Sequence, residues 1–249
     1  MNIRKHIPNT ITCANILCGA AGIVFAFSDS LELSFIMMLA AAVFDFMDGL
    51  AARLLKAYSD IGKELDSLCD VVSFGVLPSV MLSQLFMPSA LSACGRVGGK
   101  IFGLMPLLLA AFSALRLAKF NLDERQHESF LGLPTPAAAM LCGSLAAYVS
   151  VTPGGILASW CGSIAFIPLL TVLLCALLVS EIPMFSMKFG TGKETPMREK
   201  TKRLAFLAVT ALSVAAALAF GLRWTVIPII SFTAYIIINL IFAFSPQRA

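Results

Sequence analysis

The chain has 249 residues, of which 59% are hydrophobic and only 13% are charged, and its formal net charge is +4. A soluble domain carries about 25% charged residues. This composition therefore excludes an ordinary water-soluble protein and predicts that the bilayer is the solvent for most of the chain.

Eight apolar segments are long enough to cross a bilayer as helices, which takes roughly 20 residues each. In chain order they lie at about 7–27, 33–54, 66–87, 101–120, 133–152, 163–183, 204–221 and 224–244. The first is too long for the apolar core of a signal peptide and contains Pro8 and Asn15, so we expect a span. The last two are joined by a short turn and predict a helical hairpin. The expected fold class is all-α, a polytopic transmembrane helical bundle of about eight spans.

The basic residues predict the orientation of these spans. With the N-terminus inside, 15 of the 18 Lys and Arg residues fall on the inner side, and the exceptions are Arg96, Lys100 and Arg223. The positive-inside rule then places both termini in the cytoplasm, with the chain in the cell (inner) membrane. We expect a six-span core at 1–183, a basic cytoplasmic loop at 184–203 that rests on anionic headgroups, and a two-span hairpin with its tail at 204–249.

Seven cysteines and two histidines show no pattern typical of a site. The cysteine count is odd, no Cys-x-x-Cys pair occurs, and the two histidines are far apart. Neither a disulfide framework nor a His-based metal site is expected.

Four aspartates gather at the inner ends of the second and third spans. Asp45 and Asp48 share one face of the second helix, and Asp66 and Asp70 are spaced i,i+4 on the third. Since the connecting loop is short, the two acidic faces should meet. Charged groups inside a membrane are costly, which favours a functional site.

Four carboxylates in one pocket repel each other unless a cation lies among them. Oxygen ligands without His or Cys favour hard ions such as Mg²⁺ or Mn²⁺, which usually serve phosphate chemistry. Gly49 and Ala52 leave room beside the acids for a bulky ligand, and Arg53 offers a fork for a phosphate. Two alternatives stay open: the aspartates could pair with Arg53, Lys56 and Lys63, or they could line the ion pathway of a transporter.

The pattern D-x-x-D-G-x-x-A-R-x8-G-x-x-x-D-x-x-x-D, from Asp45 to Asp70, resembles the signature of the CDP-alcohol phosphatidyltransferase family. Further segments resemble the bacterial and archaeal phosphatidylserine synthase branch of that family, and together they cover roughly residues 1–190. They are Ile7–Asn15, Asp70–Pro78, Arg116–Asn121, Gly132–Pro136 and Ile182–Lys188. The final hairpin carries no such motif.

The resemblance implies that the phosphatidyl group of CDP-diacylglycerol passes to L-serine and that CMP leaves. It implies that all four aspartates bind the metal and that Asp70 is also the general base. It further implies contacts with CDP-diacylglycerol at Asn9, Thr12, Asp48, Gly49, Ala52, Arg53, Ser59 and Gly62. For the contacts on the first span, helix capping by Asn9 or Thr10 is the competing interpretation.

Serine carries a carboxylate, so its site should offer a cation. Arg116 and Lys119, at the inner end of the fourth span, are the candidates, and positive-inside anchoring is the alternative for both. Two alternative functions remain. One is the same chemistry on glycerol phosphate or inositol phosphate, and the other is an ion-coupled transporter. Membrane lipids are the expected surroundings, related enzymes are often homodimers, and no nucleic-acid partner is expected.

Overall fold

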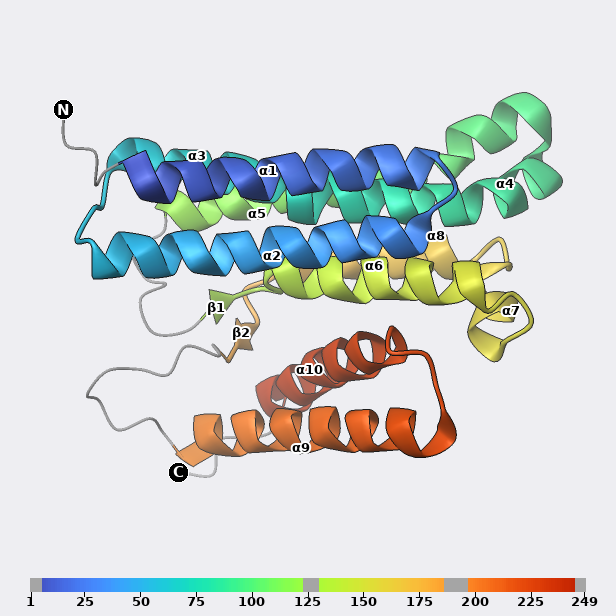
Figure 1. Cartoon of the computed structure of the whole chain (residues 1–249). Coiled ribbons are helices and arrows are strands. Elements are labelled where there is room, and N and C mark those ends of the chain that lie inside the picture. The colour runs from blue at the N-terminus through green and yellow to red at the C-terminus, as the bar shows by residue number, and fades with distance from the viewer. Residues whose placement is uncertain (1–5, 123–129, 186–196, 245–249) are drawn as a thin grey trace.

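The computed structural model describes residues 6–122, 130–185 and 197–244. Five of its helical segments are long and apolar enough to span a membrane, namely His6–Phe27, Leu31–Leu54, Asp60–Leu122, Met197–Phe220 and Val226–Phe244. Shorter apolar helices at Thr135–Val151 and Phe166–Val179 complete the bundle. The predicted class, a helical membrane bundle, is confirmed (Figure 1).

Each predicted span contains a helix. The first two spans are α1 (His6–Phe27) and α2 (Leu31–Leu54), and the third begins with α3 (Asp60–Asp70). A π-helical turn (Val71–Val76), α4 (Leu77–Gly103), a 3₁₀ turn (Met105–Leu107) and α5 (Leu108–Leu122) follow without a long break. The remaining helices are α6 (Thr135–Val151), a short unpredicted α7 (Ile156–Cys161), α8 (Phe166–Val179), α9 (Met197–Phe220) and α10 (Val226–Phe244).

The long third segment reverses direction inside α4. Gly95 has φ 70°, in the region that favours glycine, and the chain folds back there. The returning stretch packs closely, because a Cβ on Gly99 would lie 2.5 Å from Leu91 Cα. The helix therefore continues past residue 87, where the hydropathy pattern predicts its end.

The basic loop predicted at 184–203 is partly helical, since α9 begins at Met197. Lys202 forms an ion pair with Glu199 at 2.8 Å and its ammonium lies over the Phe242 ring of α10. These contacts extend the helix beyond its apolar part, where a hydropathy pattern cannot detect it. The loop residues 186–196 lie outside the described part of the chain.

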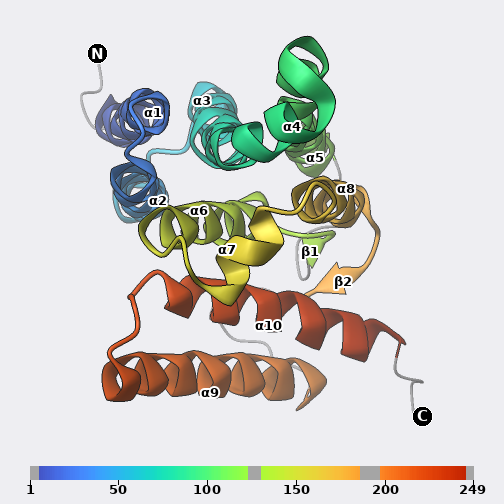
Figure 2. The same ribbon diagram turned by 90° about the vertical axis from the view of Figure 1, so that its right-hand side faces the viewer.

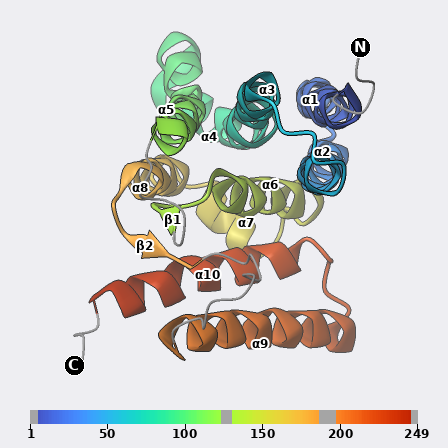
Figure 3. The ribbon, with the colours of Figure 1, turned by 90° about the vertical axis from the view of Figure 1, so that its left-hand side faces the viewer.

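Helix α6 lies at the centre of the bundle. It contacts α2 and α4 on one side and α10 on the other, and the α9–α10 hairpin covers that other side (Figures 2 and 3). A two-stranded antiparallel pair, β1 (Phe130–Leu131) with β2 (Pro183–Met184), lies beside the start of α6. The hairpin turn is held at the opposite end by the stacking of Trp224 on Phe35, whose ring centres are 5.5 Å apart.

Small residues allow α1 to approach the segment that follows α3. A Cβ on Gly19 would lie 2.3 Å from Ser73 Oγ, and that hydroxyl donates a hydrogen bond to Asn15 O at 3.2 Å. Close approach through small residues is typical of packing between membrane helices. Because α1 contacts both α2 and α3, it holds these two helices on either side of a shared space.

Candidate active site

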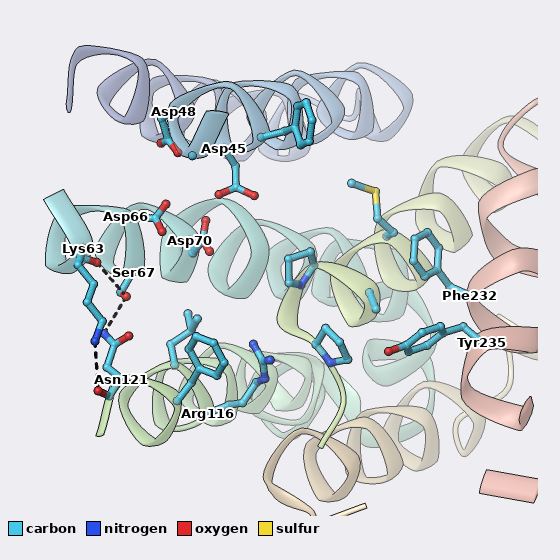
Figure 4. A pocket seen from close by; sticks show the side chains of 18 of the residues that line it. Asp45, Asp48, Lys63, Asp66, Ser67, Asp70, Arg116, Asn121, Phe232 and Tyr235 are labelled. Carbon is cyan, nitrogen blue, oxygen red and sulfur yellow. Dashed lines mark hydrogen bonds between the residues drawn. The ribbon is translucent and has the colours of Figure 1, made fainter. Parts of the chain in front are cut away.

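Carboxylates from α2 and α3 meet across this space. Asp45, Asp48 and Asp66 each place one oxygen so that all three atoms lie within 4.8 Å of one another. The helices run in opposite directions near one end of the bundle, and their acidic side chains point toward each other (Figures 1 and 4). The predicted meeting of the two acidic faces is confirmed for these three residues.

These three residues suit a divalent cation. Asp48 is buried, and within the described part of the chain neither its Oδ2 nor Oδ1 of Asp66 has a hydrogen-bond partner. Buried carboxylate oxygens without partners are costly, and a bound ion would compensate them. The donor set consists only of oxygens, as hard cations require. The alternative hypothesis, that the aspartates pair with nearby cations, receives little support from these contacts. Arg53 Nε donates to Gly49 O and Lys63 Nζ donates to Asn121 O, so both groups bind backbone carbonyls.

Asp70 lies one turn beyond Asp66 and lines a cavity together with the other three aspartates. It does not belong to the group of three whose oxygens lie within 4.8 Å of one another. Its Oδ1 accepts a hydrogen bond from Asn15 Nδ2 at 3.4 Å. Both residues are buried, and a π-helical turn begins directly after Asp70. Such turns are frequent at functional sites. The roles of Asp70 as a fourth ligand and as a base stay predictions.

A cavity of about 390 Å³ opens beside the aspartates, between α1, α2 and the start of α3. It is lined by every residue for which the resemblance implies a contact with CDP-diacylglycerol: Asn9, Thr12, Asp48, Gly49, Ala52, Arg53, Ser59 and Gly62. Sequence positions more than fifty residues apart thus meet in one cavity.

The wall of this cavity follows from local structure. Ser59 caps α3 by accepting a hydrogen bond from Gly62 N at 3.0 Å. A Cβ on Gly62 would lie 3.1 Å from Asn9 Oδ1, so glycine keeps α1 and α3 close. Because α1 begins at His6, both Asn9 and Thr10 lie inside the helix, and the interpretation of either as the N-cap is wrong.

A larger cavity of about 540 Å³ extends from the aspartates toward α5 and α10 (Figure 4). Arg116 lies along it, buried, and its Nη1 donates to Thr135 Oγ1 at 3.1 Å. The guanidinium carbon is 5.7 Å from the centre of the Phe120 ring. The structure thus places Arg116 in the site, whereas Lys119 is exposed and does not line this cavity.

The segment Gly132–Pro136 shapes the same cavity through Pro134 and Pro136. Gly132 has φ 76°, and a Cβ there would lie 2.7 Å from the carbonyl oxygens of Leu178 and Ser180. Only glycine fits this position, which directs the chain into α6 beside Arg116.

Several residues at or beside the two cavities were not predicted. Lys63 lines both cavities, Asn121 donates from Nδ2 to Ser67 Oγ at 2.9 Å, and Asn15 contacts Asp70. Phe232 and Tyr235 of α10 form the far end of the larger cavity. Polar residues inside apolar spans, such as Asn15, were the available signal. For Phe232 the sequence offers no signal, because it is one apolar residue among many.

Comparison with known proteins identifies relatives. Residues 5–166 match the model of the CDP-alcohol phosphatidyltransferase family. A Bacillus subtilis protein named CDP-diacylglycerol–serine O-phosphatidyltransferase is 36% identical over 136 residues, which are 55% of this chain and 72% of the relative. A protein of the same name from Mycobacterium tuberculosis strain H37Rv is 34% identical over 230 residues, 89% of this chain and 74% of the relative. Another, from Methanocaldococcus jannaschii, is 37% identical over 142 residues, 56% of this chain and 61% of the relative.

Proposed function

The chain belongs to the CDP-alcohol phosphatidyltransferase family, and on this basis we propose that it transfers the phosphatidyl group of CDP-diacylglycerol to L-serine, with release of CMP. One observation carries the proposal: two cavities meet at the aspartates. Asp48, Gly49, Arg53, Lys63 and Asp66 line both of them. A donor in one cavity and an acceptor in the other would meet beside the carboxylates.

The smaller cavity suits the nucleotide side of the donor. Arg53 and Lys63 are exposed cations at its edge and can contact the two phosphates. Gly49, Ala52 and Gly62 have small side chains or none, which leaves space for the nucleotide. The apolar surroundings of the bundle can receive the acyl chains from the membrane.

Asp45, Asp48 and Asp66 would hold the divalent ion, which we propose is Mg²⁺ or Mn²⁺. When bound, such an ion neutralises charge that develops on the phosphates during transfer. Asp70 would be a fourth ligand, as the family pattern implies.

The transfer forms a bond between the serine oxygen and the phosphorus attached to diacylglycerol. The bond from that phosphorus to the bridging oxygen breaks, and CMP leaves with this oxygen. Asp70 accepts the proton of the serine hydroxyl, because a hydroxyl is a poor nucleophile without a positioned base. Asn15 orients Asp70 through its hydrogen bond.

Arg116 would bind the serine carboxylate. It lines the larger cavity but not the smaller one, so it is a cation on the acceptor side alone. Its planar guanidinium can donate two parallel hydrogen bonds to a carboxylate. Glycerol phosphate or inositol phosphate would call for more cations there, and Arg53 and Lys63 are already shared with the donor cavity.

We also propose where the protein resides and which molecules it binds. The cavities lie at the end of the bundle where the charge pattern predicts the cytoplasm, so serine could arrive from water and the lipid from the membrane. We propose residence in the cell membrane, a catalytic core at 1–183, a basic segment at 184–203 and a hairpin with its tail at 204–249. CDP-diacylglycerol, L-serine, membrane lipids and a second copy of the chain are the partners.

The test uses purified protein with CDP-diacylglycerol, Mg²⁺ or Mn²⁺, and a panel containing serine, glycerol phosphate and inositol phosphate. We expect metal-dependent release of CMP with serine, and phosphatidylserine as the lipid product. Release of CMP only with another alcohol would show that this alcohol, and not serine, is the acceptor. If no alcohol causes release of CMP, the proposed enzymatic activity is wrong and the transporter hypothesis is favoured.

A further inference from the structure

The C-terminal hairpin forms one wall of the larger cavity. Phe232 and Tyr235 of α10 line this wall together with Phe185, at the end opposite the aspartates (Figure 4). The rings of Phe185 and Tyr235 are buried, with centres 4.8 Å apart. The family match ends at residue 166, so this wall is built by a part of the chain outside the matched region.

Side chains of α10 bind both backbone polar groups of Phe185. Phe185 N donates to Asn239 Oδ1 at 3.0 Å, and the Tyr235 hydroxyl donates to Phe185 O at 2.9 Å. Asn239 Nδ2 donates in turn to Tyr235 O at 2.9 Å, which orients the amide. Since all three residues are buried, these bonds define the position of Phe185 against α10.

A continuous set of contacts leads from Phe185 to Arg116. Phe185 directly follows β2, which pairs with β1. The chain after β1 is bonded back to the same region, because Gly132 N donates to Ile182 O at 3.0 Å. It then reaches Thr135, whose hydroxyl accepts the hydrogen bond from Arg116. Helix α10 is thus connected to Arg116, the cation on the acceptor side, through the β1–β2 pair and Thr135.

We propose that α10 determines acceptor specificity: Tyr235 and Phe232 limit the size of the alcohol, and Asn239 is a positioning residue that acts through Phe185. The inference rests on the proposed function and extends it to a part of the chain without a motif. The aromatic rings give a phosphate no hydrogen bonds, and the Tyr235 hydroxyl already donates to Phe185 O. A small alcohol can bind Arg116 with its one anionic group, whereas a larger phosphorylated alcohol meets an apolar wall.

The test measures CMP release by Tyr235→Ala, Tyr235→Phe and Asn239→Leu, with serine, inositol phosphate and CDP-diacylglycerol titrated separately, and Tyr235→Ala should lower the preference for serine over inositol phosphate. Tyr235→Ala and Asn239→Leu should raise the KM for serine about tenfold, the usual scale for losing one buried contact, and should change the KM for CDP-diacylglycerol less than about twofold. Tyr235→Phe keeps the ring and loses one hydrogen bond, so it should raise the serine KM less. Ile237→Ala is the control, because Ile237 is exposed on the same helix and should leave both values unchanged.

An unchanged serine KM in Tyr235→Ala and Asn239→Leu would overturn the inference, as would an equal rise of both KM values. If Tyr235→Ala or Asn239→Leu fails to fold, Tyr235→Phe decides, because an unchanged serine KM in that variant contradicts the role of its hydroxyl. The wild type separates this inference from the proposed function. A wild type that releases no CMP overturns both, whereas an active wild type with unaltered variants overturns the role of α10 alone.

Discussion

Asn15 of α1 donates a hydrogen bond to Asp70 at the end of α3, with 3.4 Å between Nδ2 and Oδ1. Ser73, three residues beyond Asp70, donates to the backbone oxygen of the same asparagine. One residue of the first helix therefore binds both the proposed base and the π-helical turn behind it. The first helix therefore contributes directly to the position of the proposed base.

Asn15→Ala should lower kcat while leaving both KM values nearly unchanged, because Asp70 loses the group that orients it. Hydrogen bonds to charged groups contribute about 1.5–3 kcal/mol, so a fall of at least about tenfold is expected. Steady-state CMP release measures it. Leu17→Ala is the matched control, since Leu17 is exposed on the same helix. A kcat equal to that of the wild type would remove Asn15 from the mechanism.

Asp66→Asn should abolish activity and weaken metal binding, because asparagine keeps the shape of the side chain but loses the charge that holds the ion. The loss should exceed about a hundredfold, which is the upper end of the range for mutating an outer-shell partner of a metal ligand. Metal titration of CMP release and direct binding of Mn²⁺ by the purified protein provide two readouts. Asp60→Asn removes an exposed carboxylate from the first turn of the same helix and should behave like the wild type. Full wild-type turnover in the presence of a chelator would refute the metal site.

Gly62→Ala should raise the KM for CDP-diacylglycerol and leave the serine KM unchanged. The added Cβ would lie 3.0 Å from Ser59 Oγ and 3.1 Å from Asn9 Oδ1, so it must displace part of the cavity wall. An effect of about 1–3 kcal/mol is typical of such overpacking, which is at least about fivefold in KM. Gly98→Ala serves as the control, because its Cβ would meet only Cys94 at an ordinary 3.6 Å. An unaltered donor KM would show that the nucleotide binds elsewhere.

Arg116→Lys should raise the KM for serine about tenfold, since the charge is kept but the planar fork is lost. Titration of serine at saturating CDP-diacylglycerol measures this change. Lys119→Ala tests the neighbouring cation and should have little effect, because Lys119 is exposed outside the cavity lining. If Arg116→Ala retains the wild-type serine KM, Arg116 anchors the topology only and the acceptor site lies elsewhere.

The end of the bundle that carries the aspartates should face the cytoplasm, as the bias of 15 to 3 basic residues predicts. A cysteine at the exposed Ile61, in a background without native cysteines, should react with an impermeant thiol reagent only from the inner side. Leu222→Cys, at the turn between α9 and α10, should react from the outer side. Labelling of Ile61→Cys from outside intact cells would reverse the topology.

The sequence by itself was sufficient for the class of protein, the approximate spans and the three aspartates that meet between α2 and α3. These properties depend on local quantities. Hydropathy over about 20 residues selects a span, and the 3.6-residue period places Asp45 and Asp48 on one helix face. The resemblance also identified eight of the residues that line the smaller cavity, because a family resemblance carries spatial information that one sequence alone does not.

Only the tertiary structure separated Arg116 from Lys119, joined Asn15 to Asp70 and placed α10 at the wall of the larger cavity. Each relationship joins helices far apart in the chain, or depends on a small rotation of one helix about its axis. Packing determines both, through close approaches such as Gly19 against Ser73 and hydrogen bonds such as Asn239 with Phe185. Hydropathy records that a residue faces away from water, but in a membrane it does not distinguish lipid from a neighbouring helix, so the partners of Tyr235 were decided by the fold.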